Sequence, residues 1–149
     1  MTQEEKSLLL KDLCGRLPYG VKCKIDKFET IFDLRGFDND DSAELRQRVI
    51  VWKKHYPSSV VSYPLIDCKP YLRPMSSMCE EEKKIQKDYI YHFSENNLPN
   101  YEGNFIFEDE VHEYIDWLNA HHFDYRGLIE KGLAIEVTEE NNQYEEINL

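Results

Sequence analysis

The amino-acid sequence predicts an α+β fold, in which an N-terminal helix, a small antiparallel sheet and C-terminal helices packed on that sheet form one unit. Two observations support this prediction. Between about Val21 and Ile66, apolar and polar residues alternate, which is typical of half-buried strands. From the segment KPYLRPMSSM (69–78) onwards, apolar residues recur every three or four positions, which is typical of helices that bury one face.

The first helix is predicted by a capping box and by helical apolar spacing. Thr2 and Glu5 have the spacing at which the hydroxyl accepts from a free amide and the carboxylate reaches back. The apolar residues that follow have helical spacing: Leu9, Leu10, Leu13, Cys14 and Leu17. Pro18-Tyr19-Gly20 then ends the helix, and we expect Cys14 to face the core.

Four strands are predicted after this helix from their alternation and their β-branched or aromatic content. Their segments are VKCKI (21–25), FETIFDL (28–34), RQRVIVWKKHY (46–56) and VVSYPLI (60–66). Asp26-Lys27 is expected to form a turn between the first two strands, and RGFDNDDS (35–42) a loop. Pro64 makes the fourth strand an edge strand.

Two further helices are predicted in the second half. The first begins at a second capping box, formed by Ser77 and Glu80, and is expected to run to about Phe93. The second falls within residues 104–122, where an apolar stripe has helical spacing. The stripe consists of Val111, Tyr114, Ile115 and Leu118.

The length of 149 residues fits one compact domain, residues 1–137, which buries enough apolar surface to form a core unaided. Residues 1–75 form its helix and sheet. Residues 76–137 are mostly helical and end in a short strand at GLAIEV (132–137). Residues 138–149 are expected to form an acidic, mobile tail.

The sequence also favours a soluble protein in a reducing compartment. The four cysteines form no CxxC pair, so neither a zinc ribbon nor a disulfide framework is indicated. The polar residues after Met1 do not resemble a secretory signal, and no apolar run is long enough to cross a bilayer. We therefore expect a cytoplasmic protein that does not bind membranes.

The charge of the chain is strongly asymmetric, and the formal net charge is −11 at pH 7. Residues 1–75 carry 13 Lys and Arg against 11 Asp and Glu, whereas residues 76–149 carry 5 against 18. An acidic surface repels phosphate backbones, so direct nucleic-acid binding is disfavoured, and it attracts basic partners. Solubility alone explains the acidity equally well. The candidate contact groups are Glu108, Asp109, Glu110, Glu113 and Asp116.

Five residues that could carry chemistry lie close together in NAHHFDYRGLIEKG (119–132). They are His121, His122, Asp124, Tyr125 and Arg126, here called the HHFDYR residues. Adjacent helical histidines point about 100° apart, so they cannot chelate one metal together. Histidine, and then Gly127, is also favoured at a helix end, because imidazole complements exposed carbonyls and glycine permits a left-handed backbone. We therefore favour a helix end, and only a cleft that gathered these side chains with another acidic group would reverse this preference.

No sequence signature of a common enzyme or cofactor site is present. The chain contains no P-loop, no GxGxxG, no HExxH and no GxSxG, so we expect no catalytic residue, no cofactor and no metal. The predicted sheet carries ring side chains that could bind a ligand, although half-buried sheet residues are the favoured interpretation. These are Trp52, His55, Tyr56 and Tyr63.

Three blocks of the sequence are distinctive: LLLKDLCGRLPYGVKC (8–23), KPYLRPMSSM (69–78) and IDWLNAHHFDYRGLIEKGLA (115–134). They cover about a third of the chain and resemble blocks of a family of small proteins from Bacteroidales phages, prophages and other mobile elements. The resemblance implies a setting, the cytoplasm of a bacterial host, rather than a reaction.

Within that setting we expect a non-enzymatic interaction protein, an inhibitor of a host defence system that presents its acidic second half to a host protein. Two alternatives stay open. A small hydrolase would use the HHFDYR residues. A nucleotide-signal-binding sponge, which would suit a homo-oligomer, would stack a base on Trp52 or a tyrosine and bind phosphate through an arginine. The candidate arginines are Arg16, Arg35, Arg73 and Arg126.

Overall fold

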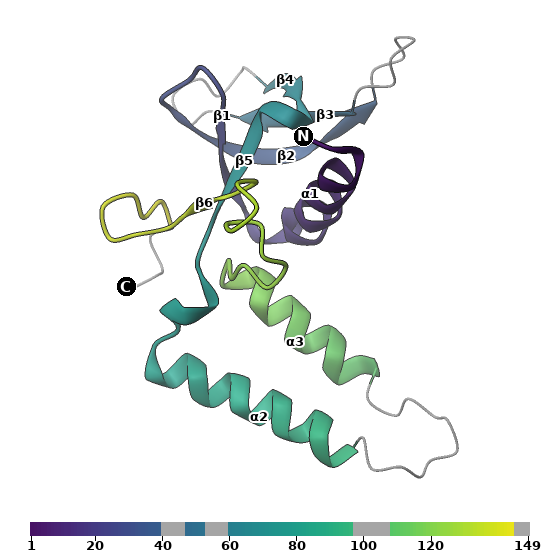
Figure 1. Cartoon of the computed structure of the whole chain (residues 1–149), viewed down its shortest axis with the longest axis vertical. Helices are drawn as coiled ribbons and strands as arrows, with labels where there is room; N and C mark the ends of the chain where they lie inside the picture. The colour runs from purple at the N-terminus through teal and green to yellow at the C-terminus, as the bar shows by residue number, and fades with distance from the viewer. Residues whose placement is uncertain (40–46, 53–59, 97–107, 145–149) are drawn as a thin grey trace.

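The structure, a computed structural model, describes residues 1–39, 47–52, 60–96 and 108–144, and it confirms the predicted α+β class (Figure 1). The helices are α1 (Gln3–Arg16), α2 (Glu80–Asn96) and α3 (Glu108–Ala120). The strands are β1 (Lys22–Ile25), β2 (Ile31–Asn39), β3 (Gln47–Trp52), β4 (Val60–Pro64), β5 (Cys68–Leu72) and β6 (Ile135–Glu136). The last strand lies within the predicted segment GLAIEV. Within the described ranges, no helix combines the length and the apolar character needed to span a membrane.

The sheet has the strand order β4-β3-β2-β1-β5-β6, and neighbouring strands are antiparallel except for the parallel pair β5 and β6. The predicted turn after β1 is confirmed, because Phe28 N–H donates to Ile25 O at 3.1 Å and Lys27 has a φ of 77°. As predicted, the strand that contains Pro64 lies at an edge of the sheet.

Two predictions for the sheet differ from the structure. Residues 35–39 of the predicted loop continue β2, because a β-bulge between Leu34 and Gly36 absorbs one residue and strand pairing then resumes. Residues 40–42 lie outside the described residues. Strand β5 is not predicted by the sequence, since Pro70 interrupts its pattern, yet it pairs with β1 inside the sheet.

The main core lies between α1 and the inner face of the sheet. Leu9 and Leu13 of α1 are buried against strand residues that share this face. These strand residues are Cys23, Ile25, Phe32, Leu34, Val49 and Val51. Cys14, predicted to face the core, is exposed, because it lies about 100° around the helix from Leu13.

The outer face of the sheet carries a second, smaller cluster to which the tail contributes. Tyr144 is buried, and its hydroxyl donates to Tyr71 O at 2.8 Å and accepts from Lys22 N–H at 2.9 Å. Val137 packs in the same cluster. The tail predicted to be mobile therefore contains an anchored residue, while residues 145–149 lie outside the described part of the chain.

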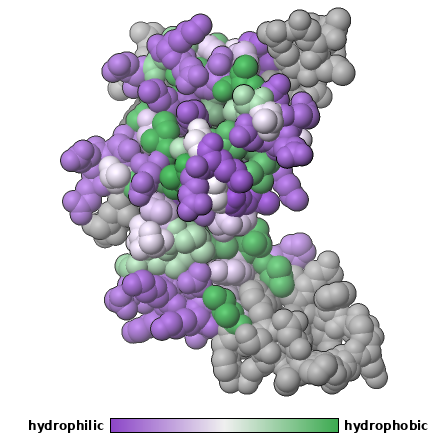
Figure 2. Space-filling view, viewed as in Figure 1, coloured by the Kyte–Doolittle hydropathy of each residue, from purple (hydrophilic) through white to green (hydrophobic). Residues whose placement is uncertain are grey.

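Helices α2 and α3 form a pair that extends away from the sheet, so the helix that covers the sheet is α1 rather than the predicted C-terminal helices (Figure 1). The ring of Tyr89 on α2 lies 5.1 Å from Tyr114 and 6.2 Å from Trp117 on α3, centroid to centroid. In the predicted stripe of α3, Leu118 is buried but Val111 is 45% exposed. Figure 2 shows a paler, more apolar band where the helix pair joins the rest of the molecule.

The two predicted capping boxes have different outcomes. The box of α1 is confirmed, because Thr2 and Glu5 exchange both hydrogen bonds. The box of α2 begins two residues later than predicted, since Ser77 lies in a 3-10 turn and its hydroxyl donates to a backbone carbonyl three residues back. Instead, Glu82 accepts from Cys79 N–H at 2.9 Å, which fixes the start of α2.

Candidate functional site

The histidine pair lies at the end of α3, and this helix ends in a Schellman motif. Phe123 N–H donates to Leu118 O at 3.0 Å, and His122 N–H donates to Asn119 O at 3.1 Å. His122 has a φ of 62°, in the left-handed region that glycine usually occupies. The prediction of a helix end is confirmed, but the residue that reverses the chain is His122 and not Gly127.

Asp124 and Tyr125 stabilise the turn that follows. The Asp124 carboxylate accepts the N–H of Leu128 at 2.8 Å and that of the next residue at 2.9 Å. The Tyr125 hydroxyl donates to Asn119 Oδ1 at 2.9 Å. Gly127, predicted to be left-handed, has a φ of 73° and lies inside this turn.

A buried ion-pair network joins this turn to α1. Asp12 and Arg16 are 1% and 0% exposed, and Arg16 Nε lies 2.7 Å from Asp12 Oδ2. Arg16 Nη2 also donates to Phe123 O at 2.6 Å. Arg126 Nε lies 3.4 Å from Asp12 Oδ1, so this member of the HHFDYR residues is also paired.

A second buried pair joins β5 to α2. Arg73 is 1% exposed, and its two Nη atoms donate to the Glu82 carboxylate at 2.9 Å each. Its guanidinium lies 4.2 Å from the centroid of the Phe123 ring, and its backbone N–H donates to His122 O at 2.7 Å. Burial raises the pKa of Glu82, but hydrogen bonds from Arg73 and from the Cys79 amide outweigh this effect and hold the pKa at about 2.

Structural contacts hold both histidines. The ring of His122 is buried and stacks on the ring of Tyr144, with 3.6 Å between centroids. Burial, reinforced by the positive charges of neighbouring arginines, lowers the pKa of His122 to about 3, so this ring is neutral at physiological pH. His121 Nδ1 lies 2.9 Å from Trp117 O, which favours the tautomer with a proton on Nδ1.

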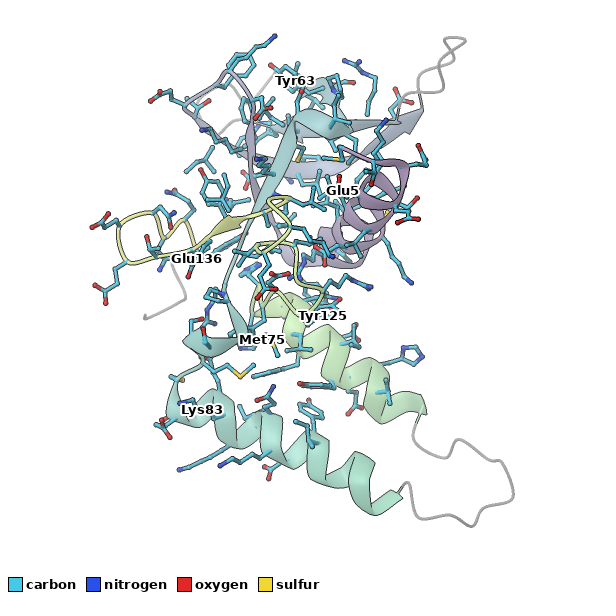
Figure 3. The ribbon with its side chains drawn as sticks, in the orientation of Figure 1. Glu5, Tyr63, Met75, Lys83, Tyr125 and Glu136 are labelled. Carbon is cyan, nitrogen blue, oxygen red and sulfur yellow. The ribbon has the colours of Figure 1, made fainter. Side chains whose placement is uncertain are left out.

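The HHFDYR residues therefore form a structural junction between α1, β5 and α3. Figure 3 shows Tyr125 where the segment after α3 meets α1. Sequence reasoning missed the partners Asp12, Glu82 and Tyr144. The four-residue spacing of Asp12 and Arg16 on one helix could have indicated the first, whereas the other two are distant in sequence from the residues they contact. Among the residues that the structure describes, no three His, Cys, Asp or Glu side chains are grouped so as to hold a metal ion.

The five residues predicted to form the acidic contact surface belong to α3. Its sequence, EDEVHEYIDWLNA, contains five acidic residues and no Lys or Arg. Glu113 and Asp116 are exposed. Glu108, Asp109 and Glu110 belong to the first turn of the same helix, but their side chains lie outside the described part of the chain.

The sheet brings together only part of the predicted ring surface. Trp52 is half-buried, and the Arg35 guanidinium lies 5.0 Å from the centroid of its ring. Tyr63 packs in an aromatic cluster of the sheet, and His55 and Tyr56 lie outside the described residues. Three of the four candidate arginines are paired with carboxylates: Arg16, Arg73 and Arg126.

Comparison with known proteins gives no match, whether to a protein-family model, to a curated protein or to a solved structure.

Proposed function

We propose that the protein is a non-enzymatic interaction protein that binds a basic partner through the acidic outer face of α3. The observation that carries this proposal is the composition of α3, which has five carboxylates and no cation of its own. In the setting that the sequence resemblance implies, the partner is a protein of a host defence system, and binding blocks its basic surface.

The geometry of the HHFDYR residues supports a binding role over a hydrolase. A catalytic base or nucleophile needs a polar atom that can reach a substrate. Asp124 caps a turn, Tyr125 bonds to Asn119, and Arg126 lies beside the buried Asp12. The side chains that a hydrolase would use therefore stabilise the junction.

The inner side of α3 is occupied by packing, which leaves its outer side for a partner. Tyr114 and Trp117 contact the Tyr89 ring of α2, and Leu118 is buried with Phe123. Carboxylates on the outer side would attract a basic partner and fix its orientation, since complementary charge governs encounter and register more than affinity.

The test compares two variants of equal charge in affinity capture from lysate of the bacterial host. The acidic-face variant changes Glu108→Gln, Asp109→Asn, Glu110→Gln, Glu113→Gln and Asp116→Asn. The control changes five other carboxylates, Glu80→Gln, Glu81→Gln, Asp88→Asn, Glu130→Gln and Glu140→Gln, all exposed. Each set neutralises five carboxylates, so both variants move from −11 to −6. Only the acidic-face variant should lose the captured protein.

Capture by the wild-type protein should also weaken as salt rises, because exposed charges are screened over a Debye length of about 8 Å at physiological ionic strength. Changing His121→Gln and His122→Gln together should leave capture intact while lowering the melting temperature. Equal capture by the two charge variants contradicts the proposal. So does loss of capture by a double histidine variant that circular dichroism shows to be folded.

A further inference from the structure

The residues that the structure describes cover the outer face of the sheet only in part. Helix α1 packs on the inner face, and Tyr144 of the tail contacts the outer face at β1 and β5. On the remaining strands, the register places Trp52 opposite Asp33 and Arg48 opposite Asp38. These side chains alternate with the buried Val49 and Val51, so Trp52 and Arg48 lie on the outer face.

The bulge in β2 places a cation against the Trp52 ring. Arg35 is the extra residue between Leu34 and Gly36, and its guanidinium lies 5.0 Å from the ring centroid. Arg35 is exposed, and among the described residues it has no ion pair with a carboxylate. A planar cation over the ring of a half-buried indole forms a surface on which an aromatic ligand can stack.

Arg48 is a second cation on this face, and its orientation is fixed. Its Nε donates to Ser62 Oγ at 2.6 Å, and its Nη2 donates to Ser62 O at 2.9 Å. Within the described ranges Arg48 makes no ion pair, although Asp38 is its cross-strand partner. Its Nη1 is therefore a preoriented donor for an anion.

The separation of Arg48 from Trp52 fits one ligand. Arg48 and Trp52 are four residues apart on the same strand and the same face, which corresponds to about 13 Å. A ligand with a ring at one end and a phosphate chain at the other could engage both positions. Pairing with β2 and β4 holds the two residues of β3 in place.

We propose that this face, formed by Arg35, Trp52 and Arg48, binds a nucleoside polyphosphate. The base stacks on the pair formed by the Trp52 ring and the Arg35 guanidinium that lies over it, and a phosphate accepts from Arg48. A free nucleotide fits better than a nucleic-acid strand, because a strand would extend beyond the patch over a chain with a net charge of −11. This site lies on the sheet and goes beyond the proposed function, which rests on α3.

Titration calorimetry with adenosine triphosphate tests the assignment. The full-length protein should show saturable binding. Arg48→Gln should weaken it by about tenfold or more, as expected for loss of a hydrogen bond to a charged group, and Arg35→Gln should weaken it through loss of the planar cation at the stacking position. Trp52→Leu should weaken it as well. The matched control is Lys24→Gln, which removes an exposed cation from the neighbouring strand β1 and should change affinity less than about twofold.

Two further ligands identify what is recognised. Inorganic tripolyphosphate should bind more weakly than adenosine triphosphate, since it cannot stack, and a single-stranded oligoadenylate should not bind more tightly. Absence of saturable binding, equal binding by the arginine variants, equal affinity for tripolyphosphate or tighter binding of the oligonucleotide each overturns the proposal. The five-carboxylate variant of α3 should bind adenosine triphosphate at least as well as the wild type, so failure of one proposal is distinguishable from failure of the other.

Discussion

Replacing Glu82 with glutamine should destabilise the protein by about 3–5 kcal/mol, because Arg73 then stays buried without its carboxylate. Arg73 is 1% exposed and donates two hydrogen bonds of 2.9 Å to Glu82. The pKa of Glu82 leads to a similar magnitude. A value of about 2 in place of 4.5 corresponds to about 3 kcal/mol of stability.

The pH dependence gives this prediction a definite sign. The pKa of Glu82 is lower in the folded protein than in the unfolded chain, so the unfolded chain binds the proton more readily. The stabilisation is therefore complete above about pH 4.5 and is lost as the pH falls towards 2. The glutamine variant has no carboxylate at position 82 to protonate, so it does not lose this stabilisation as the pH falls. The difference in unfolding free energy between the wild type and the variant should therefore shrink over the same interval.

Urea unfolding followed by circular dichroism measures both effects. The matched control is Glu80→Gln, on the same turn of α2. Glu80 lies 3.2 Å from Lys83, but its side chain is 86% exposed, so its removal should cost at most about 1 kcal/mol. If Glu82→Gln and Glu80→Gln have the same stability at pH 7, or if the difference does not change between pH 5 and pH 3, the buried pair does not stabilise the fold as argued.

Two backbone predictions concern the segment after α3. Gly127→Val should lower the free energy of unfolding by about 1 kcal/mol or more, because a β-branched residue resists a φ of 73°. An added Cβ meets no atom within 4 Å, so a steric clash does not contribute. An unchanged melting temperature would contradict the left-handed turn. His122→Ala should be less stable than His122→Gly by about 1 kcal/mol in urea unfolding, since both lose the stacked ring but only alanine must keep a φ of 62°. Equal stabilities would exclude a left-handed residue 122.

Local patterns predicted most of the elements correctly. The capping box at Thr2, the alternation in β1 and the helical spacing in α3 each depend on residues close in sequence, and each was sufficient to identify its element. Strand β5 could not be identified in this way, because Pro70 interrupts its pattern and its pairing with β1 joins distant parts of the chain.

The candidate site was predictable only at the level of a helix end. The sequence indicated that chain reversal follows α3, but it pointed to Gly127, since glycine is the usual residue at a left-handed position. His122 takes that position because its ring is buried against Tyr144, a contact made across 22 residues of sequence. Likewise, no local pattern shows that Arg35 reaches Trp52, because a bulge sets their relation.

The hydroxyl of Tyr144 has a consequence for how the protein folds during synthesis. This hydroxyl accepts from Lys22 N–H and donates to Tyr71 O. The ribosome adds Tyr144 to the chain 122 residues after Lys22 and 73 residues after Tyr71. A nascent chain can form α1 and the strands β1 to β4 from contacts between neighbouring elements. Both groups lack this partner until residue 144 has been made, so the docking of Tyr144 should follow the pairing of β1 with β5.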